Sequence, residues 1–129
     1  MNLYLYFFSK KTIFLWIISI IAISYMSLIP RIDIPVEFSY SDKVWHTFAY
    51  LWLSFLPYGG FKTRTIALAG SLLMIPLGIG LEIGQSYIPG REAAFSDAMA
   101  NSIGVIAGIV LGIFFRRYFN NTSIQRVQR

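Results

Sequence analysis

The side chains best suited to chemistry come in pairs at helical spacing. Members of a pair that are three or four residues apart lie on the same face of a helix. The pairs are Asp42 with His46, Glu82 with Gln85, and Asp97 with Asn101. A histidine titrates near neutrality, and a neighbouring carboxylate can fix the orientation of its imidazole. The residue types therefore point to general acid–base chemistry, with His46 and Glu82 as acid and base and Asp97 or Asp42 orienting the histidine.

Each pair also has a purely structural interpretation. Ser41 can cap a helix that begins at Asp42, and Asp97 suits a helix N-terminus, where the helix dipole favours negative charge. Glu82 lies seven residues before Pro89, about 8–10 Å below the end of its segment at ~1.5 Å per residue. Its carboxylate is therefore either paired, with His46 or Arg91, or protonated. It could form an interhelical hydrogen bond or act as a functional acid.

Arg91 follows a Pro89–Gly90 turn, which determines where its side chain emerges. A guanidinium at a membrane boundary can bind a phosphate or carboxylate through two parallel hydrogen bonds. It can equally be the counter-ion of Glu82 or Asp97. Both interpretations remain open at this point.

The elements that must position these groups belong to a membrane protein. The chain has 129 residues, of which 56% are hydrophobic and 13% charged, and its mean hydropathy is +0.59. A soluble domain carries about 25% charged residues. Cysteine is absent, which excludes disulfides, thiolate nucleophiles and cysteine-based metal sites.

Four apolar segments are apparent, over residues 12–29, 43–58, 65–87 and 98–115. A spanning helix needs about 20 mostly apolar residues, so the second segment is short. We predict an all-α fold, an integral membrane bundle of four transmembrane helices that forms a single domain over residues 1–129. The motif-bearing core is 41–112, the N-terminal cytoplasmic lead-in is 1–11, and a polar cytoplasmic tail is 118–129. No small-x-small cleavage site follows the first segment, which favours a retained helix over a signal peptide.

The distribution of charge predicts the orientation in the membrane. One set of basic residues flanks the ends of the segments on one side: Lys10, Lys11, Lys62, Arg64, Arg116, Arg117, Arg126 and Arg129. The opposite side has fewer basic residues and all of the acidic ones: Arg31, Lys43 and Arg91, with Asp33, Glu37, Asp42, Glu82, Glu92 and Asp97. By the positive-inside rule, both termini are cytoplasmic, and loops 30–42 and 88–97 face outward.

Glycines indicate how the helices pack. Gly104, Gly108 and Gly112 recur every four residues and form a ridge of small residues that another helix can approach closely. The third segment also contains glycines, and Pro76 is expected to kink it. We expect the third and fourth helices to pack together and to bring their polar pairs into contact. The same ridge could mediate a homo-oligomer.

The sequence excludes several other functions. The net charge is +5, but the basic residues flank apolar segments instead of forming a stripe, which argues against nucleic-acid binding. No Gly-rich phosphate loop, serine-triad signature or HExxH motif is present, so no cofactor is evident. A single histidine is too little to indicate a zinc site, and no metal site is predicted. A divalent cation held by carboxylates remains open.

The ordered set Asp42-Lys43-x-x-His46, Glu82-x-x-Gln85, Pro89-Gly90-Arg91, Asp97-x-x-x-Asn101 and Gly104-x-x-x-Gly108 resembles the VanZ-like family, named for a teicoplanin-resistance protein. The resemblance covers residues 41–112. It implies a small, multi-pass membrane protein of the bacterial cell envelope, located in the cytoplasmic (inner) membrane. Members are associated with lowered susceptibility to glycopeptide antibiotics. The matching residues are Asp42, His46, Glu82, Gln85, Arg91, Asp97 and Asn101.

Three functions fit these observations. In the first, the cluster is the active site of an enzyme that acts on a lipid or cell-wall-related amphiphile at the outer leaflet. Arg91, Gln85 and Asn101 would then bind the substrate. In the second, the same residues bind a headgroup, cell-wall precursor or antibiotic without catalysis. In the third, they only lock the helices together.

Overall fold

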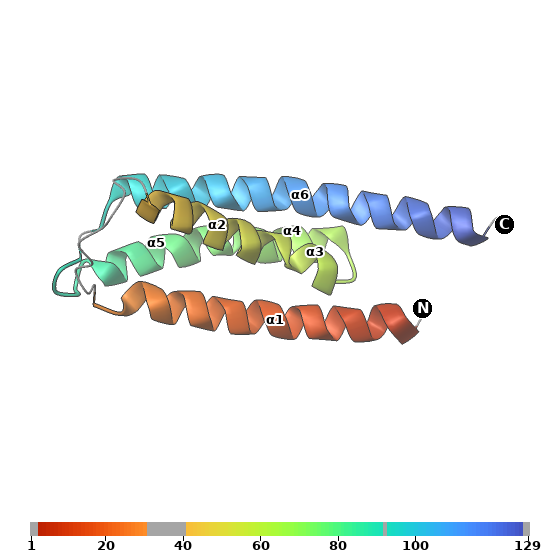
Figure 1. The fold of residues 1–129 in the computed structure, drawn as a ribbon, viewed down its shortest axis with the longest axis horizontal. Coiled ribbons are helices and arrows are strands. Elements are labelled where there is room, and N and C mark those ends of the chain that lie inside the picture. Colours follow the sequence, from red (N-terminus) through yellow and green to blue (C-terminus); the bar gives the residue numbers. More distant parts are fainter. Residues whose placement is uncertain (1–2, 31–40, 92, 128–129) are drawn as a thin grey trace.

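The computed structural model of the protein is a bundle of helices lying along one another (Figure 1). It describes residues 3–30, 41–91 and 93–127, with side chains for residues 9–30, 41–91 and 93–119. These residues form helices joined by short connections and contain no strand. The helices are α1 (Leu3–Leu28), α2 (Ser41–Phe55), α3 (Pro57–Gly60), α4 (Arg64–Leu72), α5 (Met74–Gln85) and α6 (Phe95–Val127). The predicted all-α fold is confirmed.

Three stretches of helix are long and apolar enough to cross a membrane: Ser9–Leu28, Arg64–Gln85 and Phe95–Phe119. Many of their large apolar side chains are exposed, as lipid-facing side chains would be. On α1, for example, Phe14, Ile21 and Tyr25 are each more than 60% exposed. The second predicted segment forms α2, of 15 residues, and α3, which together are at the lower limit for a span.

Two helices are longer than expected. Helix α1 begins at Leu3, so most of the predicted lead-in is helical, and α6 continues to Val127, through most of the predicted polar tail. Neither glycine nor proline occurs before Pro30 or after Gly112. Without those residues, nothing in the backbone ends a helix where the apolar pattern stops.

The third predicted segment is interrupted at Leu73, between α4 and α5. The cause is Pro76, which has no N–H and therefore cannot donate to the carbonyl four residues earlier, that of Leu72. The hydrogen bonds on either side are kept, from Leu73 N–H to the Ala69 carbonyl at 3.0 Å and from Leu77 N–H to the Leu73 carbonyl at 3.3 Å. The expected kink is present, three residues before the proline.

The glycine ridge of α6 packs against α2 and α3, and not against the third segment as predicted. A Cβ on Gly104 would overlap the carbonyl of Thr47, and one on Gly108 would overlap the carbonyl of Leu51. A Cβ on Gly112 would overlap the ring of Tyr58. Small residues allow close approach by any neighbouring backbone, and their spacing does not say which helix approaches. The pair α2–α6 consequently forms the most extensive helix contact in the bundle.

The core lies around α2, where Tyr50 and Leu53 pack with Met74 and Val105. Helix α1 is attached to this core by two tryptophan hydrogen bonds. Trp16 Nε1 donates to the carbonyl of Leu53 at 2.8 Å, and Trp52 Nε1 donates to Ser19 Oγ at 3.1 Å. Both hydrogen bonds are made by residues in the middle of α1.

The two ends of the bundle differ. The start of α1 and the end of α6 lie at one end, and the end of α1, the start of α2, the end of α5 and the start of α6 lie at the other (Figure 1). At the termini end, Arg116 Nη2 donates to the carbonyl of Lys62, and Ser9 Oγ donates to that of Gly60. Some charged residues used to predict the orientation lie outside the described side chains: Arg31, Asp33, Glu37, Glu92, Arg126 and Arg129.

Candidate functional site

The polar pairs of α2, α5 and α6 meet around one histidine. His46 Nδ1 lies 2.9 Å from Asn101 Oδ1 and 3.8 Å from Glu82 Oε1. Glu82 and Asn101 are buried, at 6% and 4% exposure. An amide oxygen only accepts hydrogen bonds, so Nδ1 carries the hydrogen, and the neutral imidazole keeps its lone pair on Nε2. His46, Glu82 and Asn101 thus converge from three separate helices.

Asp97 joins this group through an ion pair that the sequence analysis missed. Lys43 Nζ lies 3.2 Å from Asp97 Oδ1, and the Asp97 side chain is 9% exposed while that of Lys43 is 40% exposed. The available signal was that Lys43 and Asp97 each lie in the first turn of a helix beginning at the same end. Asp42, next to Lys43, contributes a carboxylate oxygen within 4.8 Å of ligand atoms of both His46 and Asp97.

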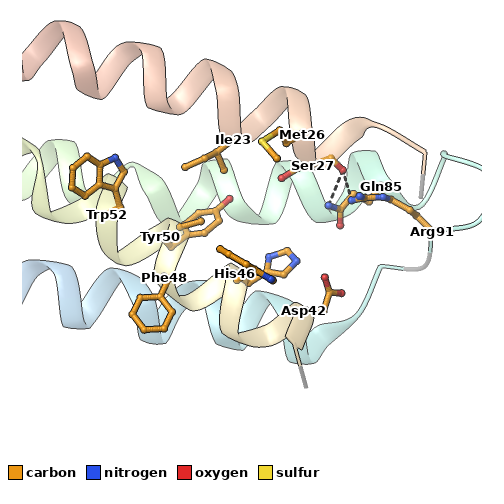
Figure 2. Close-up of a pocket in the computed structure, with 12 residues that line it drawn as sticks. Ile23, Met26, Ser27, Asp42, His46, Phe48, Tyr50, Trp52, Gln85 and Arg91 are labelled. Atoms are coloured by element: carbon orange, nitrogen blue, oxygen red, sulfur yellow. Dashed lines mark hydrogen bonds between the residues drawn. The ribbon is translucent and has the colours of Figure 1, made fainter. Parts of the chain in front are cut away.

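Gln85 and Arg91 both hydrogen-bond to the end of α1. Gln85 Nε2 donates to the carbonyl of Ser27 at 3.0 Å, and Arg91 Nη1 donates to the same oxygen at 2.5 Å (Figure 2). This carbonyl is in the last turn of α1, where helical carbonyls have no partner within the helix. The two side chains therefore cap the C-terminus of α1, where a cation also interacts favourably with the helix dipole.

Pairing of Arg91 with Glu82 or Asp97, one of the two alternatives that the sequence left open, is not found among the described residues. The Pro89–Gly90 turn, with Gly90 at φ 80°, directs Arg91 towards α1 instead. Its Nε atom is buried and has no hydrogen-bond partner in the described part of the chain. The guanidinium thus has a donor left over beside its bond to Ser27.

A pocket of about 620 Å³ opens beside His46, between α1 and α2. Its walls are mostly apolar, and its polar groups gather at one end, as Figure 2 shows. The apolar lining consists of Ile23, Met26, Trp45, Phe48, Ala49, Tyr50 and Trp52. The polar lining consists of Ser27, Asp42, His46, Gln85 and Arg91.

His46 connects this pocket with the buried polar group behind it. Glu82, Asp97 and Asn101 are each at most 7% exposed and are not part of the pocket lining. Asp42 and His46 line the pocket and also lie close to Asp97. The predicted site residues are therefore arranged in two layers. One layer faces the pocket, and the other supports His46 from behind.

This arrangement could perform acid–base chemistry on a molecule in the pocket. With Nδ1 held by Asn101, the imidazole has a defined orientation, and Nε2 can accept a proton from water or from a hydroxyl group. Arg91 and Gln85, at the same polar end, can offer further N–H groups to an anionic headgroup.

Comparison with known proteins gives one informative match. No family model matches the chain, and no solved structure matches it. The chain is 28% identical over 128 residues to an uncharacterized protein of Schizosaccharomyces pombe, C11E3.10. The aligned region covers 95% of this chain and 76% of that protein. The similarity therefore extends on both sides of residues 41–112, and because this relative is eukaryotic it does not point to a bacterial cell.

Proposed function

We propose that the protein binds a membrane amphiphile in the pocket between α1 and α2, with the polar headgroup at Asp42, His46 and Arg91. The observation that carries this proposal is the division of the pocket into an apolar wall and a polar end. An acyl or prenyl chain fits the wall formed by residues such as Met26 and Phe48, which are 68% and 61% exposed. A headgroup at the other end would exchange water for hydrogen bonds to charged and polar side chains.

The proposal includes a membrane orientation. The chain would cross the membrane four times, with α2 and α3 together as the second crossing and both termini in the cytoplasm. Support comes from Figure 1, where the two termini lie at one end of the bundle. Lys62 and Arg64 lie before and at the start of α4, and Arg116 and Arg117 lie in the C-terminal part of α6, where the positive-inside rule expects basic residues. The pocket would then open to the outer leaflet.

The resemblance to the VanZ-like family extends the proposal to the biological setting. In a bacterial cell, the membrane would be the cytoplasmic membrane and the amphiphile a lipid or a cell-wall-related molecule. Altered handling of that amphiphile would change susceptibility to glycopeptide antibiotics. The residues that support this setting are the ordered polar pairs and the glycine ridge between positions 41 and 112.

A second candidate function, catalysis on the bound amphiphile, is favoured by the surroundings of His46. Its Nδ1 is held by Asn101 at 2.9 Å, and Glu82 lies at 3.8 Å. In this version, His46 Nε2 takes a proton from a water molecule as the water oxygen attacks an ester bond of the headgroup; that bond breaks, and the imidazolium gives the proton to the alcohol that leaves. Glu82 stabilises the imidazolium that forms. The bonds from Gln85 and Arg91 to Ser27 hold these two side chains at the polar end of the pocket, where they would bind the headgroup in either version.

The binding proposal is tested by filling the pocket. Met26→Trp places a bulky ring against the apolar wall, whereas Met99→Trp makes the same change on α6 at a position that is 52% exposed and outside the pocket. Native mass spectrometry of the purified protein should detect a bound amphiphile in the wild type and in Met99→Trp, and at least tenfold less in Met26→Trp. Equal retention by both variants would refute the proposal.

Catalysis is tested separately with His46→Gln. Lipid and muropeptide profiles are compared in cells that carry no protein, the wild type or this variant. If His46 is catalytic, a species altered by the wild type stays unaltered with His46→Gln, while the purified variant still binds the amphiphile. If the variant restores the wild-type profile, catalysis by His46 is excluded and binding alone remains.

The orientation is tested by labelling, which is straightforward because the chain has no cysteine. Tyr87, near the end of α5, is 83% exposed, and Lys62 is exposed at the termini end. A membrane-impermeant maleimide should label Tyr87→Cys in intact cells and Lys62→Cys only after permeabilisation. The reverse pattern would overturn the proposed orientation.

A further inference from the structure

The geometry points to a divalent cation site formed by Asp42 and His46 of α2 and Asp97 of α6. The site lies at the polar end of the pocket and would bring the cation within reach of an anionic headgroup. Only the cation's role in binding a headgroup rests on the proposed function. Binding of the cation itself is a property of the cluster and can be measured without any amphiphile.

The donor atoms have the separation that a shared cation requires. A carboxylate oxygen from each aspartate and a nitrogen of His46 all lie within 4.8 Å of one another. Ligands on opposite sides of a divalent cation lie roughly 4–5 Å apart, given bonds of about 2.0–2.5 Å. A cation can therefore be accommodated between these three side chains with only small movements of the side chains.

An independent observation is the state of Glu82. Its side chain is buried next to the same imidazole, and its Oε2 atom has no hydrogen-bond partner in the described part of the chain. With the residue 6% exposed, an unpartnered carboxylate oxygen here carries a desolvation penalty. A cation held by Asp42, His46 and Asp97 would add positive charge next to the imidazole from which Glu82 lies 3.8 Å.

The contacts of His46 also suit a metal ligand. Asn101 accepts a hydrogen bond from Nδ1 at 2.9 Å, which leaves Nε2 with the lone pair. If that lone pair binds a cation, His46 no longer acts as the base of the catalytic alternative. Histidines that bind metals usually donate their other ring N–H to a carbonyl or carboxylate, which fixes the ring. Asn101 is placed to do this, and Glu82 lies 3.8 Å from the same nitrogen.

Lys43 is compatible with such a site. Its ammonium group contacts one oxygen of Asp97 at 3.2 Å, and its side chain is 40% exposed. A carboxylate has a second oxygen, so Lys43 and a cation can share Asp97. The lysine can alternatively turn to solvent when the cation binds.

The ligand set indicates the class of cation. Two carboxylates favour hard ions, and one imidazole favours the borderline ions of the first transition row. Mn²⁺ satisfies both preferences, and it has the practical advantage of a spectroscopic signal. A cation here would bind a phosphate or carboxylate headgroup as a Lewis acid.

The test uses the purified full-length chain in nanodiscs of uncharged lipid, with no amphiphile added. Mn²⁺ binding is followed by the loss of the free-ion electron paramagnetic resonance signal. We expect one Mn²⁺ per chain, and affinity at least tenfold weaker in Asp42→Asn and in His46→Gln. Tyr87→Phe, an exposed change at the same end, should leave the affinity unchanged. Size-exclusion chromatography reports whether each variant is folded.

If His46→Gln does not fold, Asp42→Asn at the pocket surface decides the result. The inference is overturned if the wild type binds no Mn²⁺, or if Asp42→Asn binds it as tightly as the wild type. Failure here would leave the result of Met26→Trp unaffected. Conversely, Mn²⁺ binding by a protein that retains no amphiphile would uphold the cation site and reject the proposed function.

Discussion

Replacing Gly104 by alanine should weaken the bundle and the site together, because this glycine lies where α6 touches the backbone of α2. A Cβ added here would overlap the carbonyl of Thr47 and would lie 3.0 Å from both Leu51 N and Tyr50 Cβ. Ordinary contacts begin at 3.4 Å, so relieving the contacts with Leu51 and Tyr50 alone needs a local separation of 0.4 Å, and the closer Thr47 carbonyl needs more. Overpacking of this kind costs about 1–3 kcal/mol. We expect a cost in the upper part of that range, because the new Cβ would meet backbone atoms, which cannot move aside as a side chain can.

The same separation should reach His46. Asn101 lies three residues before Gly104 and on the same face of α6, and its bond to His46 Nδ1 is 2.9 Å long. Opening by 0.4 Å would lengthen that bond to about 3.3 Å, near the limit of a useful hydrogen bond. Gly104→Ala should therefore lose bound amphiphile as well as stability, although the substituted residue does not line the pocket.

Gly80→Ala is the matched control. A Cβ at Gly80 meets nothing within 4 Å, so the substitution should stabilise α5 by about 0.5–1 kcal/mol through helix propensity. The assay is equilibrium unfolding in mixed micelles with increasing dodecyl sulfate. If Gly104→Ala is as stable as Gly80→Ala, the assigned packing of α6 on α2 is wrong.

Four further predictions concern single side chains. Ser54 Oγ is fully buried without a partner in the described residues, so Ser54→Ala should be neutral or stabilising by up to about 1 kcal/mol. Ser71→Ala should instead cost about 1 kcal/mol by removing hydrogen bonds of 2.6 and 3.0 Å. Lys43→Gln should cost about 1 kcal/mol, because Asp97 stays buried while its half-exposed partner is lost. Trp16→Phe should cost about 1 kcal/mol by removing a 2.8 Å bond to the α2 backbone. Unfolding titrations measure all of these, and an unchanged midpoint for Ser71→Ala or Trp16→Phe would contradict the assigned bonds.

The helical character and the grouping of the polar pairs could be predicted from the sequence. Hydropathy alone locates the helices, because backbone groups in lipid must find partners within their own segment. The convergence of Glu82 and Asn101 was predicted from packing of the third segment on the fourth, although the glycines used for that inference face α2 and α3 instead. Polar groups at similar depth on neighbouring helices tend to find one another in an apolar surrounding.

The identity of the helix that meets the glycine ridge could not be predicted. Glycines reveal that a neighbour comes close, but Thr47 and Leu51 contribute their backbone, which carries no sequence signal. Arg91 was similarly ambiguous, because a carbonyl at the end of α1 competes with carboxylates for its guanidinium, and the carbonyl of Ser27 looks like any other in the sequence. The pocket itself depends on the space between α1 and α2, which no local pattern reports.

The central claim is that the space between α1 and α2 holds a particular amphiphile next to His46, and photo-crosslinking tests it most directly. A benzophenone amino acid replaces Phe48 in the pocket or, as a control, Phe114, which is 64% exposed on α6 and outside the pocket. After irradiation in native membranes, mass spectrometry identifies the captured molecules. We predict one species enriched at least fivefold at position 48 over position 114. The same mixture of bulk lipids at both positions would contradict the claim.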